Sequence, residues 1–185
     1  MPHLISFISL SLDGCYADAQ SDMGFAHSQD PEQAEFTAQN AAGGGMLVFG
    51  RITYEMMASF WPTPTAAQMM PDVAASMNAR PKLVFSRSMK SADWNNTRVA
   101  KDDLVDELKQ LKAGKGPDMA ILGSGSIVAQ AATAGLLDEL QVMLVPVTLG
   151  AGKRLFDGIP RSLAWRREEA RQFSNGNVFL RYRPA

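Results

Sequence analysis

The sequence has little of what builds covalent or metal cross-links. It contains one cysteine, Cys15, and two histidines. A single cysteine cannot form a disulfide within the chain, and this usage is typical of a reducing compartment. Structural zinc sites normally take four Cys or His side chains, so we expect no metal site. Cys15 itself is expected to be a small buried apolar residue.

An excess of charge of one sign and long apolar runs are also lacking. The 18 Lys and Arg residues balance 19 Asp and Glu residues, so we expect no nucleic-acid partner. No apolar run is long enough to span a membrane, so no membrane partner is expected either. The apolar segment 1–14 has no Lys or Arg before its apolar stretch, which makes it a poor signal peptide. We expect a cytoplasmic protein.

The composition is that of an ordinary globular domain. The chain has 185 residues, of which 46% are apolar and 20% are charged. These values argue against a disordered chain, a collagen or a disulfide-rich miniprotein. No repeat, low-complexity tract or linker divides the sequence. One domain is therefore expected over residues 1–185, with a core of its own.

Strand and helix patterns alternate along the chain, which is typical of an α/β domain. Apolar segments predict strands at 4–12, 46–49, 82–85, 119–122 and 140–147. Helices are predicted from about 30 to the glycines 43–45, at 53–59 and 71–78, from 102 or 103 to 114, and from 123 to 135. The tail segments 163–173 and 178–183 are joined by Asn175-Gly176, a strong hairpin signal. These patterns together predict a mostly parallel sheet that ends in an antiparallel hairpin.

The first helix has a well-marked start. Asp30 is a good N-cap residue, and Pro31 suits the first helical position. Gln33 is placed to reach back toward the cap, as in a capping box. Phe36 and Ala41 are predicted to face the core.

Two glycine-containing turns each follow a predicted strand and open a helix. These are Gly-Arg-Ile-Thr at 50–53 and Gly-Ser-Gly-Ser at 123–126. A helix start presents free N–H groups and a partial positive charge, both of which favour phosphate. Arg51 adds a bidentate donor and Thr53 a hydroxyl. Each turn alone is equally compatible with an ordinary tight turn, but two such starts in one domain favour a dinucleotide, which has two phosphates.

Better-known motifs are incomplete in this sequence. Val128 stands where the dinucleotide fingerprint has its third glycine, and Arg154 stands where a Walker loop has Ser or Thr after Gly-Lys. Ser124 lacks the flanking glycines of a nucleophile elbow. Only His3 and His27 are available to a serine hydrolase, so that class is not favoured.

Several polar residues near predicted strand or helix ends are further candidates. Arg87, in Ser86-Arg87-Ser88, follows a strand, and ligands bind beyond strand carboxyl ends in α/β sheets. An arginine there can bind a 2′-phosphate. The alternative is that Arg87 lies in an ordinary solvated loop with no ligand. Asp13 ends the first strand, where Asp-Gly is also a plain turn former. Glu32 lies in the first turn of a helix, where surface carboxylates are common.

Three more side chains are candidates for the substrate side of a site. Phe25 and His27 lie in the loop before the first helix, and Trp61 follows the second helix. A loop histidine is usually solvated, and a tryptophan can serve packing alone, so both readings stay open.

Taken in order, these segments resemble dihydrofolate reductase and, more closely, the RibD C-terminal family, the reductase domain of a riboflavin-biosynthesis enzyme. The resemblance covers nearly the whole chain, and its order and spacing are specific. It is carried by LSLDG at 10–14, VFGRITYE at 48–55, KLVFSR at 82–87, ILGSGSI at 121–127, GLLDEL at 135–140 and PVTLGAGKRLF at 146–156.

The resemblance implies a dihydrofolate reductase-like three-layer α/β/α fold around a sheet of eight or nine strands. It also implies an NADPH-dependent reductase, and homodimers are usual on the riboflavin side of the family. By motif matching, the cofactor phosphates would meet Gly50, Arg51 and Thr53, and the adenosine 2′-phosphate would meet Ser86 and Arg87. The pyrophosphate and nicotinamide would meet Gly123, Ser124, Gly125, Ser126 and Ile127, with Tyr16 and Ala17 near the nicotinamide ring.

The reaction implied is hydride transfer to a small pyrimidine- or pterin-like substrate, as in 5-amino-6-(5-phosphoribosylamino)uracil reductase and dihydrofolate reductase. Asp13 or Glu32 would orient a ring N–H or relay a proton through water, with Asp13 preferred because packing fixes its position. Leu144 stands where dihydrofolate reductase has a threonine supporting its substrate carboxylate. A nucleotide-binding protein of the same fold without turnover is therefore the alternative.

Overall fold

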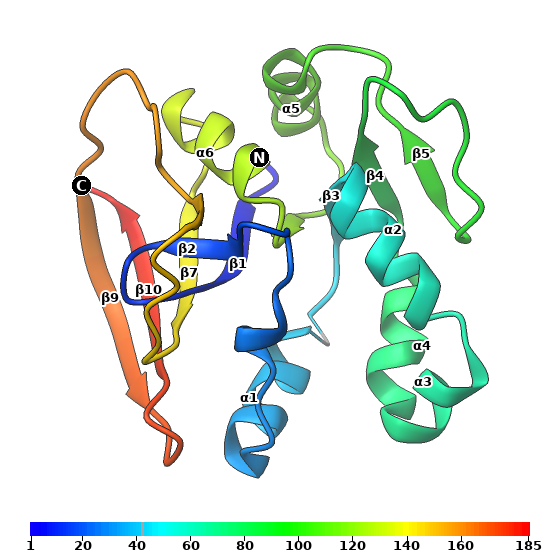
Figure 1. Cartoon of the computed structure of the whole chain (residues 1–185). Coiled ribbons are helices and arrows are strands. Elements are labelled where there is room, and N and C mark those ends of the chain that lie inside the picture. The colour runs from blue at the N-terminus through cyan, green and yellow to red at the C-terminus, as the bar shows by residue number, and fades with distance from the viewer. Residues whose placement is uncertain (42) are drawn as a thin grey trace.

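An eight-stranded sheet forms the centre of the computed structural model, which describes residues 1–41 and 43–185. The strand order is β5-β4-β3-β6-β1-β7-β10-β9, and Figure 1 shows the sheet from one side. Its strands are β1 (Leu4–Leu10), β3 (Met46–Gly50), β4 (Lys82–Phe85), β5 (Thr97–Val99), β6 (Met119–Leu122), β7 (Glu139–Leu144), β9 (Trp165–Gln172) and β10 (Val178–Pro184).

The sheet is parallel from β5 to β7 and antiparallel from there on. β1 pairs in parallel with β6 and β7, β3 with β4 and β6, and β4 with β5. β10 runs antiparallel to both β7 and β9, and the turn between β9 and β10 contains Gly176 at φ +86°. The predicted mostly parallel sheet with a C-terminal hairpin is confirmed.

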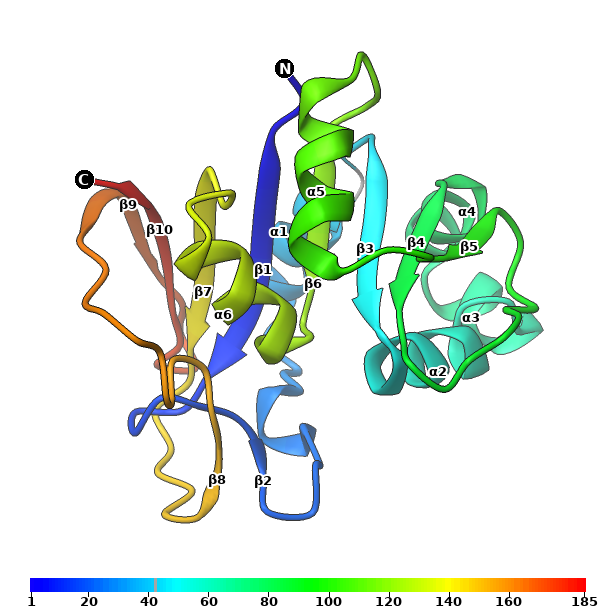
Figure 2. The same ribbon diagram turned by 90° about the horizontal axis from the view of Figure 1, so that it is seen from above.

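Helices cover both faces of the sheet, which gives the expected three layers. They are α1 (Pro31–Ala41), α2 (Arg51–Phe60), α3 (Pro64–Met69), α4 (Pro71–Ala79), α5 (Leu104–Ala113) and α6 (Gly125–Thr133). α5 and α6 lie on one face, and α1 and α4 lie on the other (Figure 2). A 3-10 turn, Gly24–Ala26, precedes α1.

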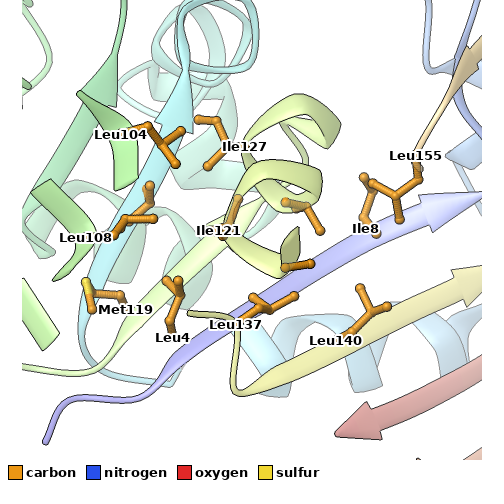
Figure 3. Close-up of a cluster of buried hydrophobic side chains, with 14 of the residues drawn as sticks. Leu4, Ile8, Leu104, Leu108, Met119, Ile121, Ile127, Leu137, Leu140 and Leu155 are labelled. Carbon is orange, nitrogen blue, oxygen red and sulfur yellow. The ribbon is translucent and has the colours of Figure 1, made fainter. Parts of the chain in front are cut away.

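β1 shows why the central strands are apolar along their whole length. Leu4 and Ile8 point toward α5 and α6 and are almost fully buried (Figure 3). Ile5 and Phe7 pack against the clusters on the opposite face. Side chains alternate across a strand, so a strand covered on both sides needs apolar residues at every position. Ser6 departs from this pattern: its Oγ is buried and has no hydrogen-bond partner among the described residues.

The start of the first helix is as predicted, but its capping is only partly so. The Asp30 carboxylate accepts a hydrogen bond from the Gln33 N–H at 2.8 Å. The predicted capping box is wrong, because the Gln33 Oε1 instead accepts from Asn175 and Asn177, both at 2.8 Å. The hairpin turn between β9 and β10 therefore competes successfully for this side chain.

Several short elements were not predicted. α3 starts at Pro64 and is capped by Thr63, whose Oγ1 accepts from the Ala66 N–H at 3.2 Å. β2 (Cys15–Asp18) and β8 (Gly152–Arg154) form a separate antiparallel pair. β8 is exposed along its whole length, so it has no apolar pattern to mark it. Two predicted strands end early, at Leu10 and Leu144, where the chain turns away from the sheet.

Candidate functional site: a cavity at two helix starts

A cavity of about 840 Å³ opens at the carboxyl ends of β3, β4, β5 and β6. That volume lies in the range of ordinary small-molecule sites. Its lining comes from six places in the chain. The residues are Tyr16, Ala17, Ser21 and Met23; Gly50 to Thr53; Phe85 to Ser88; Ala100 and Asp102 to Leu104; and Ser124 to Ile127 with Gln130, together with Lys153 from β8.

The sheet topology explains why a cavity forms here. β3 and β6 are neighbours in the sheet. The chain leaves β3 through α2 toward β4 on one side, and leaves β6 through α6 toward β7 on the other. Figure 2 shows the two connections diverging beyond the strand ends. In open α/β sheets such a divergence leaves a crevice that binds ligands.

The start of α2 has no cap from its own side chains. Its N-cap residue is Gly50, which has no side chain to accept from the first helical N–H groups. Arg51 follows and forms an exposed i,i+4 ion pair with Glu55 at 2.8 Å. Exposed pairs of this kind contribute only about 0.3–0.5 kcal/mol, so the guanidinium is easily released to a ligand. The free N–H groups and Arg51 together suit an anion.

The start of α6 is uncapped for a different reason. Its N-cap residue is Ser124, a residue type that usually accepts from its own helix. Here the Ser124 Oγ accepts instead from the Gly50 N–H, at 2.7 Å, and makes no cap hydrogen bond. Ser124 adopts left-handed backbone angles, φ 54° and ψ 58°. Both helix starts therefore keep unsatisfied donors, and one hydrogen bond joins the two.

Tyr16 closes one side of the cavity, and its ring packs closely against Gly125. A Cβ atom on Gly125 would be only 2.3 Å from the Tyr16 Cε1 atom. The ring therefore needs glycine at the first residue of α6. Burial raises the pKa of the Tyr16 phenol, so the group stays neutral and keeps its proton at physiological pH.

Arg87 stands at the far end of the cavity, beyond β4. Within the residues that the structure describes, no carboxylate lies within ion-pair distance of its guanidinium. The Ser86 Oγ accepts from the Ser88 N–H at 3.2 Å and the Met89 N–H at 3.0 Å, which shapes this loop. Asp102 and Asp103 line the same end, and Asp103 caps α5 by accepting from the Val105 N–H at 3.0 Å.

Most of the residues expected to bind a cofactor meet in this cavity. Gly123 is the exception: it does not line the cavity, and its φ of +59° serves the turn before α6. A Cβ there would lie 3.4 Å from the Thr53 Cγ2, which is ordinary van der Waals distance, so this turn lies against the first turn of α2.

Several lining residues were missed from the sequence, and three of them come from one part of the fold. Ser21, Met23 and Lys153 reach the cavity through the β2–β8 pair and the segment after β2. The Lys153 Nζ donates to the Ser21 Oγ at 2.6 Å. In the sequence, only the position of Lys153 within the segment 146–156, which carries the family resemblance, pointed to this residue. Its pairing partner in β2, Ala17, lies more than 130 residues earlier in the chain, so no local pattern links the two.

The structure does not bring Asp13 to the cavity. Its carboxylate accepts from the Ser11 hydroxyl at 2.6 Å, the Leu149 N–H at 3.1 Å and the Gly150 N–H at 2.9 Å. These donors, the Ser11 hydroxyl above all, lower the pKa of Asp13 to about 2. The contacts are those of a residue that fastens the loop before β8 to the end of β1.

Glu32 and the three candidate substrate residues also lie outside the cavity lining. Glu32 is exposed on α1 and forms an ion pair with Arg171 of β9 at 2.8 Å. Phe25 is half-buried in the 3-10 turn, and His27 is exposed just after it. The Trp61 indole donates to the Met57 Sδ at 3.1 Å and packs against the core beneath α2.

Two further observations concern other classes of site. In the described ranges 1–41 and 43–185, no group of three or more His, Cys, Asp or Glu side chains gathers as a metal site would require. Among the same residues, no helix is both long and apolar enough to cross a membrane.

Several solved structures share this fold. A protein of Shewanella sp. PV-4, named as a candidate riboflavin biosynthesis protein, is 24% identical with a TM-score of 0.77, and the match covers 99% of each chain. The diaminohydroxyphosphoribosylaminopyrimidine deaminase/5-amino-6-(5-phosphoribosylamino)uracil reductase of Thermotoga maritima is 14% identical with a TM-score of 0.69. The present chain is covered completely in that match but spans 57% of the Thermotoga chain.

Dihydrofolate reductase of Enterococcus faecalis, solved with NADP(H), is a more distant match. It is 17% identical with a TM-score of 0.63, and the match covers 98% of the present chain and 96% of the enzyme. At these identities the likenesses establish the fold alone, and they confirm the dihydrofolate reductase-like architecture. The sequence itself matches the model of the RibD C-terminal domain over residues 2–179. The protein belongs to the RibD C-terminal domain family.

Proposed function

We propose that the protein is an NADPH-dependent reductase of a small pyrimidine- or pterin-like heterocycle. The observation that carries the proposal is the pair of uncapped helix starts, at α2 and α6, that open into one cavity and are joined by the Ser124–Gly50 hydrogen bond. A dinucleotide has two linked phosphates, and two linked donor sites match that chemistry. Membership of the RibD C-terminal domain family supports a reductase.

The residues present fit NADPH. The free N–H groups at the starts of α2 and α6 would hold the linked phosphates, with Arg51 as a charged donor beside them. Arg87 would hold the 2′-phosphate, since it is exposed and has no carboxylate partner among the described residues. Asp102 and Asp103 stand at the same end of the cavity, and an acidic residue there can instead bind the free 2′-hydroxyl of NADH. The preference between the two cofactors therefore tests the role of Arg87.

When bound, the nicotinamide would supply a hydride to a C=N or C=O carbon of the substrate. The protein would orient the reacting groups, and the Tyr16 ring, seated on Gly125, would help to form the wall beside them. The neutral Tyr16 phenol would be able to donate a hydrogen bond there. The prediction that Asp13 or Glu32 relays a proton gains no support, because both carboxylates are engaged by other groups away from the cavity.

One observation favours a second candidate function. Neither predicted catalytic carboxylate lines the cavity. A nucleotide-binding protein without turnover would need the helix starts and the arginines but no proton relay.

The homodimer expected from the family resemblance also stays a prediction, which light scattering on the purified protein would test.

Titration with NADPH and NADH, followed by tryptophan fluorescence, tests the proposal. Wild type should bind NADPH more tightly than NADH. Arg51→Ala should weaken both cofactors by roughly 10- to 150-fold, the loss of one charge-assisted contact of about 1.5–3 kcal/mol. Arg87→Ala should weaken NADPH but spare NADH.

The outcomes separate the two candidate functions. Binding together with oxidation of NADPH by a pyrimidine, pterin or quinone-like substrate supports a reductase. Binding without turnover over a broad substrate set favours the nucleotide-binding protein. Failure to bind either nucleotide overturns both.

A further inference from the structure

The hydroxyl of Ser124 has an unusual hydrogen-bond partner for a residue at the start of a helix. It follows β6 and precedes α6, in the position where a serine normally accepts from the second or third N–H of its own helix. It accepts instead from the Gly50 N–H, 74 residues earlier in the chain, at 2.7 Å. Gly50 occupies the same N-cap position on α2. The two N-cap residues are thus bonded to each other, and neither has a side chain serving its own helix.

The backbone of Ser124 gives independent support for a special role. Its φ of 54° lies in the left-handed region, which is costly for a residue with a Cβ atom. Among the described residues, the other non-glycine positions with positive φ are Ser21 and Asn96. Strained non-glycine backbone persists only where the surrounding structure holds it, and it is concentrated at functional sites.

The two helix starts are also in direct contact. A Cβ on Gly50 would lie 3.4 Å from the Ser124 Oγ and 3.5 Å from the Ile127 Cδ1, which is ordinary van der Waals distance. Both residues line the cavity. The hydrogen bond therefore sets how far apart the free N–H groups of α2 and α6 lie.

We propose that Ser124 is a positioning residue that locks the two helix starts at the spacing of a diphosphate. This inference rests on the proposed cofactor site and deepens it. Because the Ser124 Oγ accepts from the Gly50 N–H, it does not cap its own helix, and the N–H groups of Gly125 and Ser126 stay open to a ligand. By bonding across, it holds the α2 and α6 donors in one register. Two donor sets held in register bind a linked pair of phosphates more tightly than the same donors do when their spacing varies, because less motion is lost on binding.

The prediction separates ligands by how many linked phosphates they carry. NADP⁺ carries a pyrophosphate bridge that would reach both helix starts. Adenosine 2′,5′-bisphosphate carries the same adenosine and 2′-phosphate but only one phosphate of the bridge. Loss of the Ser124 hydroxyl should therefore weaken NADP⁺ by about tenfold or more, equal to roughly 1.4 kcal/mol, and adenosine 2′,5′-bisphosphate by much less.

The test is calorimetric titration of both ligands into wild type and two variants. Ser124→Gly removes the hydroxyl but keeps backbone that adopts a left-handed conformation without cost. Ser124→Asn tolerates the same backbone and restores a side-chain oxygen that can accept from Gly50. Asn96→Gly is the matched control, because Asn96 also has positive φ and a side-chain hydrogen bond, to Ala79, but lies outside the cavity lining. Thermal melts of each variant report the fold.

The inference predicts a selective loss of NADP⁺ affinity in Ser124→Gly, partial recovery in Ser124→Asn, and an unchanged ratio of affinities in Asn96→Gly. A purely structural role would lower the melting temperature and weaken both ligands alike, or neither, and would overturn the inference. If Ser124→Gly does not fold, Ser124→Asn decides: any loss should fall on NADP⁺ more than on adenosine 2′,5′-bisphosphate, and an equal loss of affinity for both ligands would overturn the inference. If wild type binds adenosine 2′,5′-bisphosphate and NADP⁺ equally well, the inference fails while the cofactor site stands. If wild type binds neither ligand, the proposed function itself fails.

Discussion

Replacing Gly125 by alanine should destabilise the protein by crowding Tyr16. The new Cβ would lie 2.3 Å from Cε1 and 2.4 Å from Cδ1 of the Tyr16 ring. Carbon atoms in good contact are about 3.5–4.0 Å apart, so the ring must move by more than about 1 Å. These ring atoms are close to the Tyr16 backbone, so the movement cannot be confined to the tip of a flexible side chain.

The sign of the effect depends on two opposing magnitudes. Alanine is favoured over glycine within a helix by about 1 kcal/mol, although less at the first residue. Overpacking costs typically about 1–3 kcal/mol. The net expectation is a loss of about 1–2 kcal/mol in the free energy of unfolding, or roughly 2–8 °C in the melting temperature for a chain of this size.

Urea unfolding of single and double variants measures this directly. Gly125→Ala should lower the midpoint, and Tyr16→Ala should remove most of that effect when it is combined with Gly125→Ala. Tyr16→Phe is the control, because the Tyr16 hydroxyl has no protein partner in the described hydrogen bonds and its loss should cost little. Equal midpoints for wild type and Gly125→Ala would refute the close packing of Tyr16 on α6.

Three further predictions follow from buried or engaged polar groups. Ser6→Ala should raise the free energy of unfolding by about 1 kcal/mol, because the Ser6 Oγ is buried without a partner among the described residues; a clear loss on urea unfolding would contradict this. Burial, helped by Arg80, lowers the pKa of Lys82 to about 8 from 10.5. The unfolded chain then binds more protons between pH 8 and 10.5, so stability should rise with pH across that window, and a Lys82→Gln variant with the same rise would rule the cause out. The pKa of Asp13 is likewise lowered, from 3.8 to about 2, so its stabilising effect is present above 3.8 and is lost as the pH falls toward 2. Asp13→Asn should therefore lower stability at neutral pH and flatten the acid limb while leaving NADPH affinity unchanged; a variant that lost turnover but kept its stability would restore Asp13 to a catalytic role.

The parts of the site that could be predicted from sequence are those that local patterns encode. Gly50-Arg51 and the segment 123–126 each join an apolar strand to a helix, and a helix start after a buried strand is an anion site by local geometry alone. Arg87 was predicted for a related reason, since it lies two residues beyond the end of β4, where α/β sheets bind ligands. The parallel strands around them were predicted because burial on both faces requires unbroken apolar segments.

The parts that were not predictable depend on contacts between distant segments. Lys153 reaches the cavity only because β8 pairs with β2. The carboxylate of Asp13 accepts hydrogen bonds from the N–H groups of Leu149 and Gly150, and no local pattern around residue 13 predicts these contacts. In the same way, the Ser124–Gly50 hydrogen bond joins two turns that look independent in the sequence.

The central claim is that the uncapped starts of α2 and α6 together hold the phosphates of a dinucleotide. The most direct test is to follow backbone amide resonances by two-dimensional NMR while NADPH is added to the labelled protein. We expect the largest shifts at the N–H groups of Arg51, Ile52, Gly125 and Ser126, which are the free donors at the two starts. Shifts confined to other parts of the chain, or none at saturating NADPH, would contradict the account.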